Sequence, residues 1–176
     1  MARLCGELNT ENPILYLEAG CGVGNMLFPI AEAYSHWRFQ AFDFSKNAVK
    51  LLEERAKEKK IPVETSVVDL SIPLPESPFS APADVASLIF VISAIHPEKH
   101  RIVAENLAKL VKPGGLLFIR DYGANDHAMV RFGRGAKLDE RFYARQDGTR
   151  AYYFFTEELP GDLLRLIRVP EDGISA

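Results

Sequence analysis

The chain contains 176 residues with 47% apolar content and a formal net charge of −3. A chain of this length and composition can bury one sizeable core, so we expect a soluble globular protein with one domain over residues 1–176. The longest strongly apolar stretch, Leu88–Ile95, is too short to cross a bilayer, so we expect no membrane span. The small net charge argues against a protein that coats nucleic acid through bulk charge, although it leaves room for a local basic face.

The chain has two cysteines, Cys5 near the N-terminus and Cys21 inside a glycine-rich segment. Two thiols in these places fit a reducing compartment better than a disulfide framework or a zinc site. We therefore expect no metal and a cytoplasmic location, with the nucleus and the mitochondrion as alternatives. The sequence leaves the oligomeric state open.

Short apolar runs alternate along the chain with segments of helical periodicity. We predict a helix after Asn25, a second helix capped by Ser45, and a third that opens at His96–Pro97. The predicted strands are residues 14–17, 38–42, 63–68, 85–92 and 116–120. Five strands separated by helices or crossover loops predict an α/β fold with a doubly wound, mainly parallel sheet. Ligands bind such sheets beyond the carboxyl ends of the strands, at the topological switch point.

The periodicity also predicts the buried faces of the later helices. In the second helix the expected inward positions are Ala48, Leu51, Leu52 and Ala56. In the third helix they are Ile102, Asn106, Leu107, Leu110 and Val111. Residues 72–82, with four prolines, must form a crossover loop, and Lys–Pro–Gly–Gly at 112–115 ends the third helix.

A glycine-rich turn separates the first predicted strand from the first helix. Gly20, Gly22 and Gly24 form a pattern that both nicotinamide and S-adenosylmethionine enzymes use at this place. The dinucleotide pattern requires a third glycine three residues after the second, where this chain has Asn25. Glu18, beside the turn, would repel a pyrophosphate but tolerates the ammonium and sulfonium groups of S-adenosylmethionine. The turn therefore favours S-adenosylmethionine as the cofactor, and a nicotinamide oxidoreductase is the less favoured alternative.

Acidic residues also end the second and third predicted strands. Asp43 can accept both ribose hydroxyl hydrogens, and a cap for the helix that begins at Ser45 is an equally weighted alternative. Asp69 is placed to accept the adenine amino group, with the backbone of Leu70 at the ring edge and Ile89 against the adenine face. Glu18, Asp43 and Asp69 thus lie at the ends of three successive predicted strands, and together they predict a cofactor site.

Several short segments resemble one family of methyltransferases. They are residues 17–25, 43–45, 88–97, 120–123, 126–129 and 142–150. The first segment is shared by many methyltransferases, whereas Arg–Gln–Asp–Gly–Thr–Arg at 145–150, following Arg–Asp–Tyr–Gly at 120–123, is much narrower. From about residue 14 to residue 156 the chain resembles the tRNA N3-methylcytidine methyltransferases.

This resemblance implies a class I methyltransferase fold, S-adenosylmethionine as methyl donor, and methylation of a cytidine in a tRNA anticodon loop. It assigns cofactor contacts to Gly20, Asp43, Asp69, Leu70 and Ile89. The predicted cofactor site also includes their neighbours Glu18, Gly22 and Phe44. A seryl-tRNA synthetase assists some family members, so the resemblance implies tRNA and such a synthetase as partners.

The predicted reaction needs little from a general base. N3 of neutral cytosine carries its own lone pair and can attack a sulfonium methyl group without losing a proton. Catalysis then depends on in-line positioning and on a group that stabilises the positive charge appearing on the base. Asp121 and Asp147 are the candidates for accepting from the cytosine N4 amino group. Because N3 lies on the Watson–Crick edge, the target base must be unpaired or extruded.

Residues 120–150 contain seven Lys or Arg residues against five acids, mixed with aromatic residues. We predict that Arg145 and Arg150 hold RNA phosphates and that Tyr143 stacks on a base. Tyr152 and Phe154 are further stacking candidates. A solvated surface or an ion pair is the alternative for the two arginines, and a place in the core is the alternative for the aromatic residues.

The chain departs from this family at both ends. Family members carry a longer N-terminal region and complete the sheet with two further strands in a hairpin, whereas we find no sixth or seventh strand in residues 156–176. We therefore expect an incomplete methyltransferase domain, shortened at both ends, with an apolar sheet edge at residues 115–119. The alternative functions are a catalytically inactive shortened paralogue that binds cofactor or tRNA, and a methyltransferase that acts on a small molecule.

Overall fold

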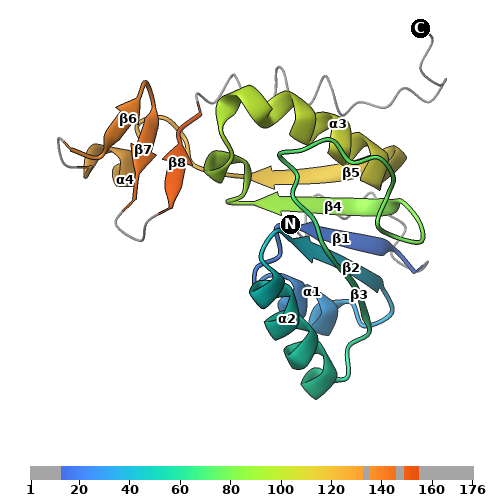
Figure 1. Ribbon diagram of the computed structural model, residues 1–176. Coiled ribbons are helices and arrows are strands. Elements are labelled where there is room, and N and C mark those ends of the chain that lie inside the picture. The colour runs from blue at the N-terminus through green and yellow to red at the C-terminus, as the bar shows by residue number, and fades with distance from the viewer. Residues whose placement is uncertain (1–12, 133–134, 146–148, 155–176) are drawn as a thin grey trace, which may run out of the picture.

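The main sheet is parallel throughout. The computed structural model describes residues 13–132, 135–145 and 149–154. The strands of this sheet are β1 (Leu15–Ala19), β2 (Arg38–Asp43), β3 (Val63–Val67), β4 (Ala83–Ile89) and β5 (Val111–Arg120). They lie in the order β3-β2-β1-β4-β5 (Figure 1). The order reverses between β1 and β4, which confirms the predicted doubly wound α/β fold and places its switch point between these two strands.

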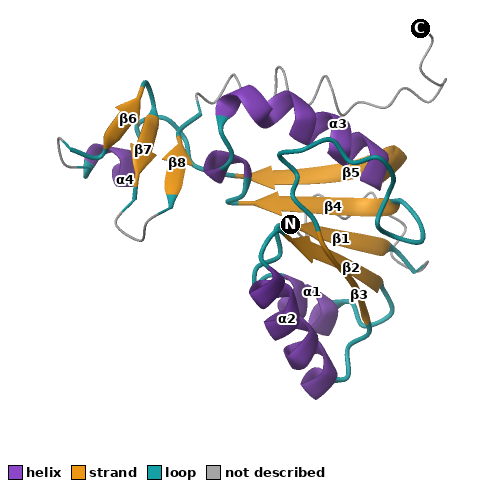
Figure 2. Ribbon diagram, in the orientation of Figure 1, coloured by secondary structure: helices purple, strands orange, loops and turns teal. Residues whose placement is uncertain are grey.

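Helices cover both faces of this sheet. α1 (Leu27–Ala33) and α2 (Lys46–Lys59) lie on one face, and α3 (His100–Leu110) lies on the other (Figure 2). The central strand β1 is buried on both faces, because Tyr16 belongs to the core that includes α1 and α2 residues, whereas Leu17 belongs to the core that includes α3 residues. This double burial explains why β1 is a continuous apolar run in the sequence.

The proline-rich segment between β3 and β4 forms the predicted loop and packs into the core on the α3 side. Asn106 of α3 holds this loop in place. Its Nδ2 donates to the carbonyl oxygens of Leu70 (3.0 Å) and Ile72 (2.8 Å), and its Oδ1 accepts from the N–H of Leu74 (2.9 Å). The predicted inward position of Asn106 is therefore confirmed, and a polar side chain is stable there because its amide is paired.

The end of β4 differs from the prediction. The strand stops at Ile89, whereas we expected it to reach residue 92. Phe90 adopts a left-handed backbone conformation with a φ of 56°, and the chain then turns through the 3-10 segments η2 (Ile92–Ala94) and η3 (Pro97–Lys99). A positive φ on a phenylalanine leaves no signal in a sequence, so the continuous apolar run concealed the turn.

The third helix and the fifth strand follow one another without a loop. α3 ends at Leu110, and β5 begins at Val111 rather than at residue 116. The helix ends before the Lys–Pro–Gly–Gly segment, as predicted, but this segment and Val111, which we expected on the helix, belong to the strand. Gly114 has a φ of 74°, and the pairing of β4 with β5 shifts register between Ala83 and Val85. The strand therefore accommodates the prolines and glycines as an irregularity at its start.

The buried faces of α2 and α3 are rotated slightly from the predicted ones. In α2, Leu51 is 49% exposed. The buried residues of α2 are Val49, Leu52 and Ala56. The buried residues of α3 are Val103, Ala104, Asn106, Leu107 and Leu110. The helix cap is confirmed, because Ser45 Oγ accepts from the N–H of Ala48 at 3.3 Å. The packing of each helix against the strand side chains, which periodicity does not contain, decides this rotation.

A second, smaller sheet lies beyond the carboxyl ends of β4 and β5 (Figure 1). A short helix and three antiparallel strands form this part of the chain: α4 (His127–Val130), β6 (Lys137–Asp139), β7 (Phe142–Ala144) and β8 (Arg150–Tyr152). We did not predict them, because three-residue strands are too short to show alternation. Phe154, after β8, joins the small sheet to the domain by donating its N–H to the carbonyl of Tyr122 (3.0 Å).

Within the described part of the chain, β5 is an edge strand, as predicted. Leu116 on this strand is 37% exposed. The prediction that residues 156–176 add no strand lies outside the described residues. No helix among the described residues is long and apolar enough to span a bilayer.

Candidate cofactor site

A cavity of about 450 Å³ lies at the switch point of the main sheet. Predicted cofactor residues that line it are Gly20, Asp43, Phe44, Asp69 and Leu70. Other parts of its wall come from the chain after β4 and from the start of β8; these are Phe90, Val91, Ala94, Ile95, Thr149 and Arg150. The fold therefore brings the turns after β1, β2 and β3 to one place, opposite a wall to which the small sheet contributes.

The glycine-rich turn after β1 needs its glycines for different reasons. Gly20 has a φ of 69°, and a Cβ atom there would overlap the side chain of Val91 on the neighbouring loop. Gly24 has a φ of 80°, and its Cβ atom would lie 2.6 Å from Cε2 of Phe28. Gly22 has a φ of 51° with open space around it. Gly20 thus allows the loops after β1 and β4 to approach each other closely at the cavity.

Asp43 connects two turns at the bottom of the cavity. Its side chain is 9% exposed, its Oδ2 accepts from the N–H of Gly22, and its Oδ1 accepts from the N–H of Ser45, both at 2.9 Å. The helix cap that we considered for this residue belongs instead to Ser45, whose own hydroxyl accepts from the first turn of α2. Each carboxylate oxygen keeps a further acceptor position, so Asp43 can also accept from a ribose hydroxyl.

Glu18 is a buried carboxyl next to the same turn. It is 5% exposed, and its Oε2 atom has no hydrogen-bond partner. Burial, and secondarily the carboxylate of Asp43, raise its pKa to about 8 against the opposing hydrogen bond from the N–H of Leu27. A buried carboxyl with one unpaired oxygen favours a nearby cation and disfavours a phosphate. The residues present therefore fit a cofactor with an ammonium group, such as S-adenosylmethionine, better than a dinucleotide.

Cys21 lies in the turn as a free, buried thiol. Burial and the carboxyl of Glu18 raise its pKa to about 12, so the thiol stays protonated and unreactive. No group of three or more His, Cys, Asp and Glu side chains is arranged to hold a metal ion within the described ranges.

The turn after β3 presents the residues predicted to meet adenine. Asp69 is exposed, and its Oδ1 accepts from the N–H of Ser71 (2.8 Å). Leu70 is 4% exposed, and Asn106 holds its carbonyl. Ile89 ends β4, one residue before the cavity wall begins at Phe90. The adenine contacts of Asp69, Leu70 and Ile89 stay predictions.

Sequence reasoning did not assign the wall formed by Phe90, Val91, Ala94 and Ile95, although these residues lie in a segment that resembles the family. The turn that presents them follows from the left-handed conformation of Phe90, which the sequence does not signal. Thr149, which also lines the cavity, was not predicted as a site residue either.

Each carboxylate oxygen of Asp121, a predicted catalytic residue, accepts from one backbone N–H. Its Oδ2 accepts from the N–H of Ser93 (3.0 Å), and its Oδ1 accepts from the N–H of Tyr122 (2.9 Å). It therefore ties Ser93 of η2, which lies between the cavity residues Val91 and Ala94, to the end of β5. A contact with a cytosine amino group stays a prediction. Asp147, the other candidate, lies outside the described residues.

The two arginines predicted to bind RNA occupy different places. Arg150 is exposed and lines the cavity. Arg145 is half-buried, and its guanidinium carbon lies 5.4 Å from the ring centroid of Tyr122, whose hydroxyl accepts from Nη1. The backbone N–H of Arg145 donates to the carbonyl of Thr149 (2.8 Å). Arg150 thus lines the cavity beside the predicted cofactor residues, whereas Arg145 lies between β7 and β8 of the small sheet.

The aromatic residues of the small sheet are largely packed against one another. Tyr143 stacks on Phe132 with ring centroids 4.8 Å apart and an interplanar angle of 11°. Phe154 is 7% exposed and belongs to a core cluster, so the core alternative holds for this residue. Tyr152 is half-buried and lies against that core.

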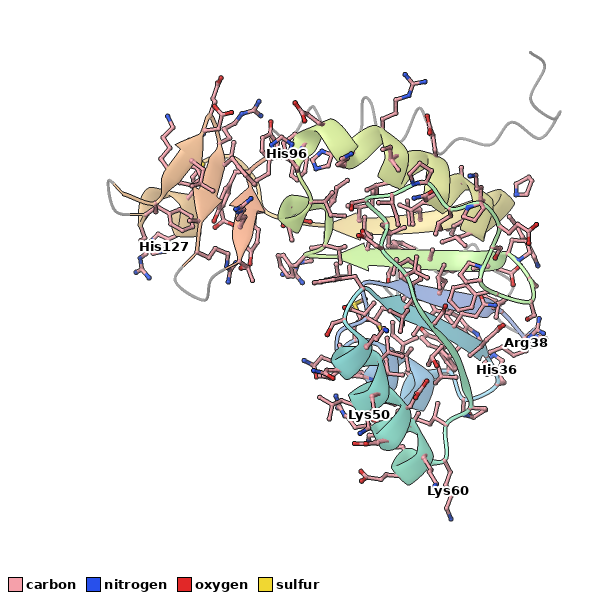
Figure 3. All side chains as sticks on the ribbon, viewed as in Figure 1. His36, Arg38, Lys50, Lys60, His96 and His127 are labelled. Carbon is pink, nitrogen blue, oxygen red and sulfur yellow. The ribbon has the colours of Figure 1, made fainter. Side chains whose placement is uncertain are left out.

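Histidines lie at both ends of the main sheet (Figure 3). His96 lies before α3, next to the small sheet, and its Nδ1 accepts from the N–H of Glu98 (3.4 Å). This confirms its predicted place at a helix start. His127 begins α4 at the outer side of the small sheet, whereas His36 lies at the opposite end of the main sheet.

The strand order, the turn after β1 and the cavity beside Asp43 define a Rossmann-like fold of the class I methyltransferase type. Residues 17–117 match the model of the family described as "Methyltransferase domain". The chain therefore belongs to the methyltransferase domain family.

Curated relatives extend this similarity beyond the family model. The chain is 45% identical over 168 residues to tRNA N(3)-cytidine methyltransferase METTL6 of Mus musculus, covering 92% of this chain and 57% of that protein. It is 43% identical over 146 residues to tRNA N(3)-cytidine methyltransferase METTL2 of Danio rerio, covering 81% of this chain and 41% of that protein. The chain spans about half the length of the curated relatives it matches.

Solved structures share the fold. The PH0226 protein of Pyrococcus horikoshii OT3 aligns with a TM-score of 0.69 and 18% identity, over 95% of this chain and 76% of that one. PKMT2 of Rickettsia typhi, solved in complex with AdoHcy, aligns with a TM-score of 0.52 and 27% identity, over 61% of this chain and 22% of that one.

Proposed function

We propose that this chain is an S-adenosylmethionine-dependent methyltransferase that forms N3-methylcytidine in the anticodon loop of a tRNA. The observation that carries the proposal is the cavity at the switch point, where Gly20, Asp43 and Asp69 meet Arg150 of the small sheet. The 45% identity to a tRNA N(3)-cytidine methyltransferase supports the choice of substrate.

The turns after β1, β2 and β3 would hold the cofactor. S-adenosylmethionine, when bound, supplies an electrophilic methyl group. Asp43 would accept from the ribose hydroxyls with the acceptor positions that its two backbone partners leave free. Asp69 would accept from the adenine amino group. The buried carboxyl of Glu18, with Oε2 unpaired, favours the ammonium group on its side of the turn.

In this proposal, the side chains around the target cytosine would hold it in position and offset the positive charge that methylation creates on it. No side chain has to remove a proton, because cytosine N3 attacks with its own lone pair. Arg150, on the cavity wall, and Arg145, between β7 and β8, would hold phosphates on either side of an extruded base. Asp121 and Asp147 are the proposed acceptors for the N4 amino group, where a carboxylate would offset the positive charge that methylation creates.

Mass spectrometry of methylated RNA tests this proposal. The chain is incubated with S-adenosylmethionine and an unmodified tRNA transcript, and the RNA is digested to nucleosides. We expect N3-methylcytidine in the wild-type reaction and a strong loss with Asp43→Ala, which removes the acceptor of the ribose and of both turns. A reaction without methylcytidine would contradict the proposal.

The same experiment separates the alternatives. Binding of S-adenosylhomocysteine and tRNA without turnover would identify an inactive binding module. Methyl transfer to a small molecule, with unmodified tRNA left unchanged, would identify a small-molecule methyltransferase. Neither alternative is supported by a particular feature of the cavity.

A seryl-tRNA synthetase as partner and a cytoplasmic location are further parts of the proposal. The family resemblance supports the partner, and the free thiol of Cys21 is consistent with a reducing compartment. Co-purification with a tagged seryl-tRNA synthetase, with and without tRNA, tests the first. Fluorescence microscopy of the tagged chain tests the second.

A further inference from the structure

Phe90 is held in a conformation that is unfavourable for its residue type. Its φ is 56°, in the left-handed region that a bulky side chain rarely adopts. Its N–H donates to the carbonyl of Arg120 (2.8 Å), which fixes the backbone at the end of the β4–β5 pair. Such strain persists where the surrounding structure imposes it, and it is concentrated at ligand sites. Here its consequence is to present an aromatic ring at the cavity.

The ring of Phe90 is 43% exposed and lines the cavity. The ring of Tyr122 lies 4.9 Å from it, and the guanidinium carbon of Arg120 lies 5.4 Å from its centroid. Arg145 in turn lies over Tyr122. Arg120, Phe90, Tyr122 and Arg145 therefore form a row of rings and cations, which we call the aromatic row, that runs from the cofactor cavity to the small sheet.

Other aromatic residues near the cavity are less suited to receive a substrate base. Tyr143 already stacks on Phe132 at 4.8 Å and meets Tyr153 edge-on at 5.6 Å. Phe44 is 76% exposed, but it follows Asp43 and thus lies on the side predicted to hold the ribose of the cofactor. Phe90 combines exposure, a place on the cavity wall and neighbouring cations.

We infer that Phe90 is the surface on which the target cytosine stacks, and that the aromatic row guides the single-stranded loop RNA to it. This inference rests on the proposed function. Extruded bases are commonly held by stacking on aromatic side chains, and arginines beside the rings add attraction to phosphates. Phe90 thus replaces Tyr143 as the base-stacking residue, and it acts as a positioning residue for the N3 atom.

Fluorescence of a base analogue tests the stacking directly. The probe is an anticodon stem-loop RNA with pyrrolocytosine at the loop cytidine, titrated with the chain in the presence of S-adenosylhomocysteine. Stacking on Phe90 should quench the probe with wild type and with Phe90→Tyr. Phe90→Leu keeps an apolar side chain without a π face, so it should lose the quench and weaken binding at least fivefold. Because Phe90 also lines the cofactor cavity, the Kd for S-adenosylhomocysteine should rise as well, but by a smaller factor than the Kd for the RNA.

Phe90→Gly guards against a folding defect. Glycine adopts a φ of 56° readily, so this variant keeps the backbone conformation while it removes the ring. It should melt cooperatively and behave like Phe90→Leu toward the probe. The matched control is Leu51→Ala, a 49% exposed apolar residue on α2, which should bind the probe like wild type.

The outcomes separate the two proposals. Equal quench, affinity and KM for RNA in wild type, Phe90→Leu and Phe90→Gly would overturn the inference while leaving the proposed function intact. An equal loss of S-adenosylhomocysteine and RNA binding in folded Phe90→Gly would also overturn it. A wild-type chain that binds S-adenosylhomocysteine but neither binds nor methylates the RNA would overturn both.

Discussion

The main sheet and the small sheet hold their site residues by different means. At the main sheet, backbone groups fix the positions of the site residues. Asp43 accepts from two backbone N–H groups, and Gly20 leaves space for the neighbouring loop. At the small sheet, side chains hold one another. Arg145 lies over Tyr122 and Tyr143 stacks on Phe132. A site built on the backbone of buried strands presents one geometry, whereas side-chain stacks can exchange one partner for another.

This difference matches the two proposed ligands. A small cofactor requires fixed acceptors, and the carboxyl ends of buried parallel strands provide them. A flexible RNA loop requires rings and cations that can rearrange. The two regions meet at Arg150, which belongs to the small sheet and lines the cofactor cavity. Substitutions on either side of this boundary test whether the regions act separately.

The largest expected effect comes from Gly20→Ala, which should disrupt the glycine-rich turn at the cofactor cavity of the main sheet. The added Cβ would overlap Val91 and would sit on a residue with a φ of 69°. The left-handed strain and the overlap together should destabilise the protein by about 2–5 kcal/mol and reduce S-adenosylhomocysteine affinity at least tenfold. Chemical denaturation and titration calorimetry measure the two effects.

Gly22→Ala is the control for this prediction. Its φ is 51°, but no atom lies near its Cβ position, so only the left-handed strain of about 1–2 kcal/mol applies. The double change Gly20→Ala with Val91→Ala should recover part of the lost stability. Equal effects of the two single glycine substitutions would contradict the close-approach role of Gly20.

The next largest effect is a change in the pH dependence of stability with Glu18→Gln. The folded pKa of Glu18 is about 8, above the ordinary value of 4.5, so the native state binds this proton more tightly than the unfolded state. The stabilisation is complete below pH 4.5 and is lost as pH rises toward 8, by up to about 1.4 kcal/mol per pH unit. Glutamine does not titrate, so the stability of wild type relative to this variant should fall between pH 5 and 8. Parallel pH profiles of wild type and variant, measured by urea denaturation, would refute the raised pKa.

A smaller effect is expected from Asp121→Asn, which tests the boundary between the regions. The amide keeps one acceptor for the N–H groups of Ser93 and Tyr122 and loses the other, at a cost of about 1–3 kcal/mol. If Asp121 only holds the η2 turn, KM for both ligands should rise and kcat should change less than tenfold. A hundredfold loss of kcat with unchanged KM would instead assign Asp121 to the reacting base. Steady-state kinetics on a tRNA transcript decides between these outcomes.

The smallest effects are expected from substitution of Arg145 and Arg150. These two variants test most directly whether the main sheet and the small sheet bind their ligands separately. Arg145→Ala should weaken tRNA binding about threefold to tenfold at moderate salt and leave S-adenosylhomocysteine affinity unchanged. Arg150→Ala should weaken both, because Arg150 lines the cofactor cavity. Filter binding of tRNA at several salt concentrations and calorimetry of the cofactor product measure the two affinities. Identical behaviour of the two variants would show that the regions are not separable at this boundary.

Most of the cofactor side could be predicted from local sequence. Glycine spacing, an acid at each strand end and a cap at Ser45 are patterns within a few residues, and the structure places Gly20, Asp43 and Asp69 around one cavity. The chain beyond β4 could be predicted less well. The turn at Phe90 lies inside an apolar run, and three-residue strands such as β7 (Phe142–Ala144) carry no periodic signal.

The sequence by itself determined the order of the five main-sheet strands and the helices between them, the class of the fold, and the acids at the ends of the first three strands. These follow from periodicity and from the requirement that parallel strands end at one edge of a sheet. Only the tertiary structure decided the partners of those residues. It left Glu18 Oε2 unpaired, engaged both oxygens of Asp121 with backbone N–H groups, and brought Arg150 to the cavity. Such contacts join residues far apart in the chain, so they arise from packing and not from local pattern.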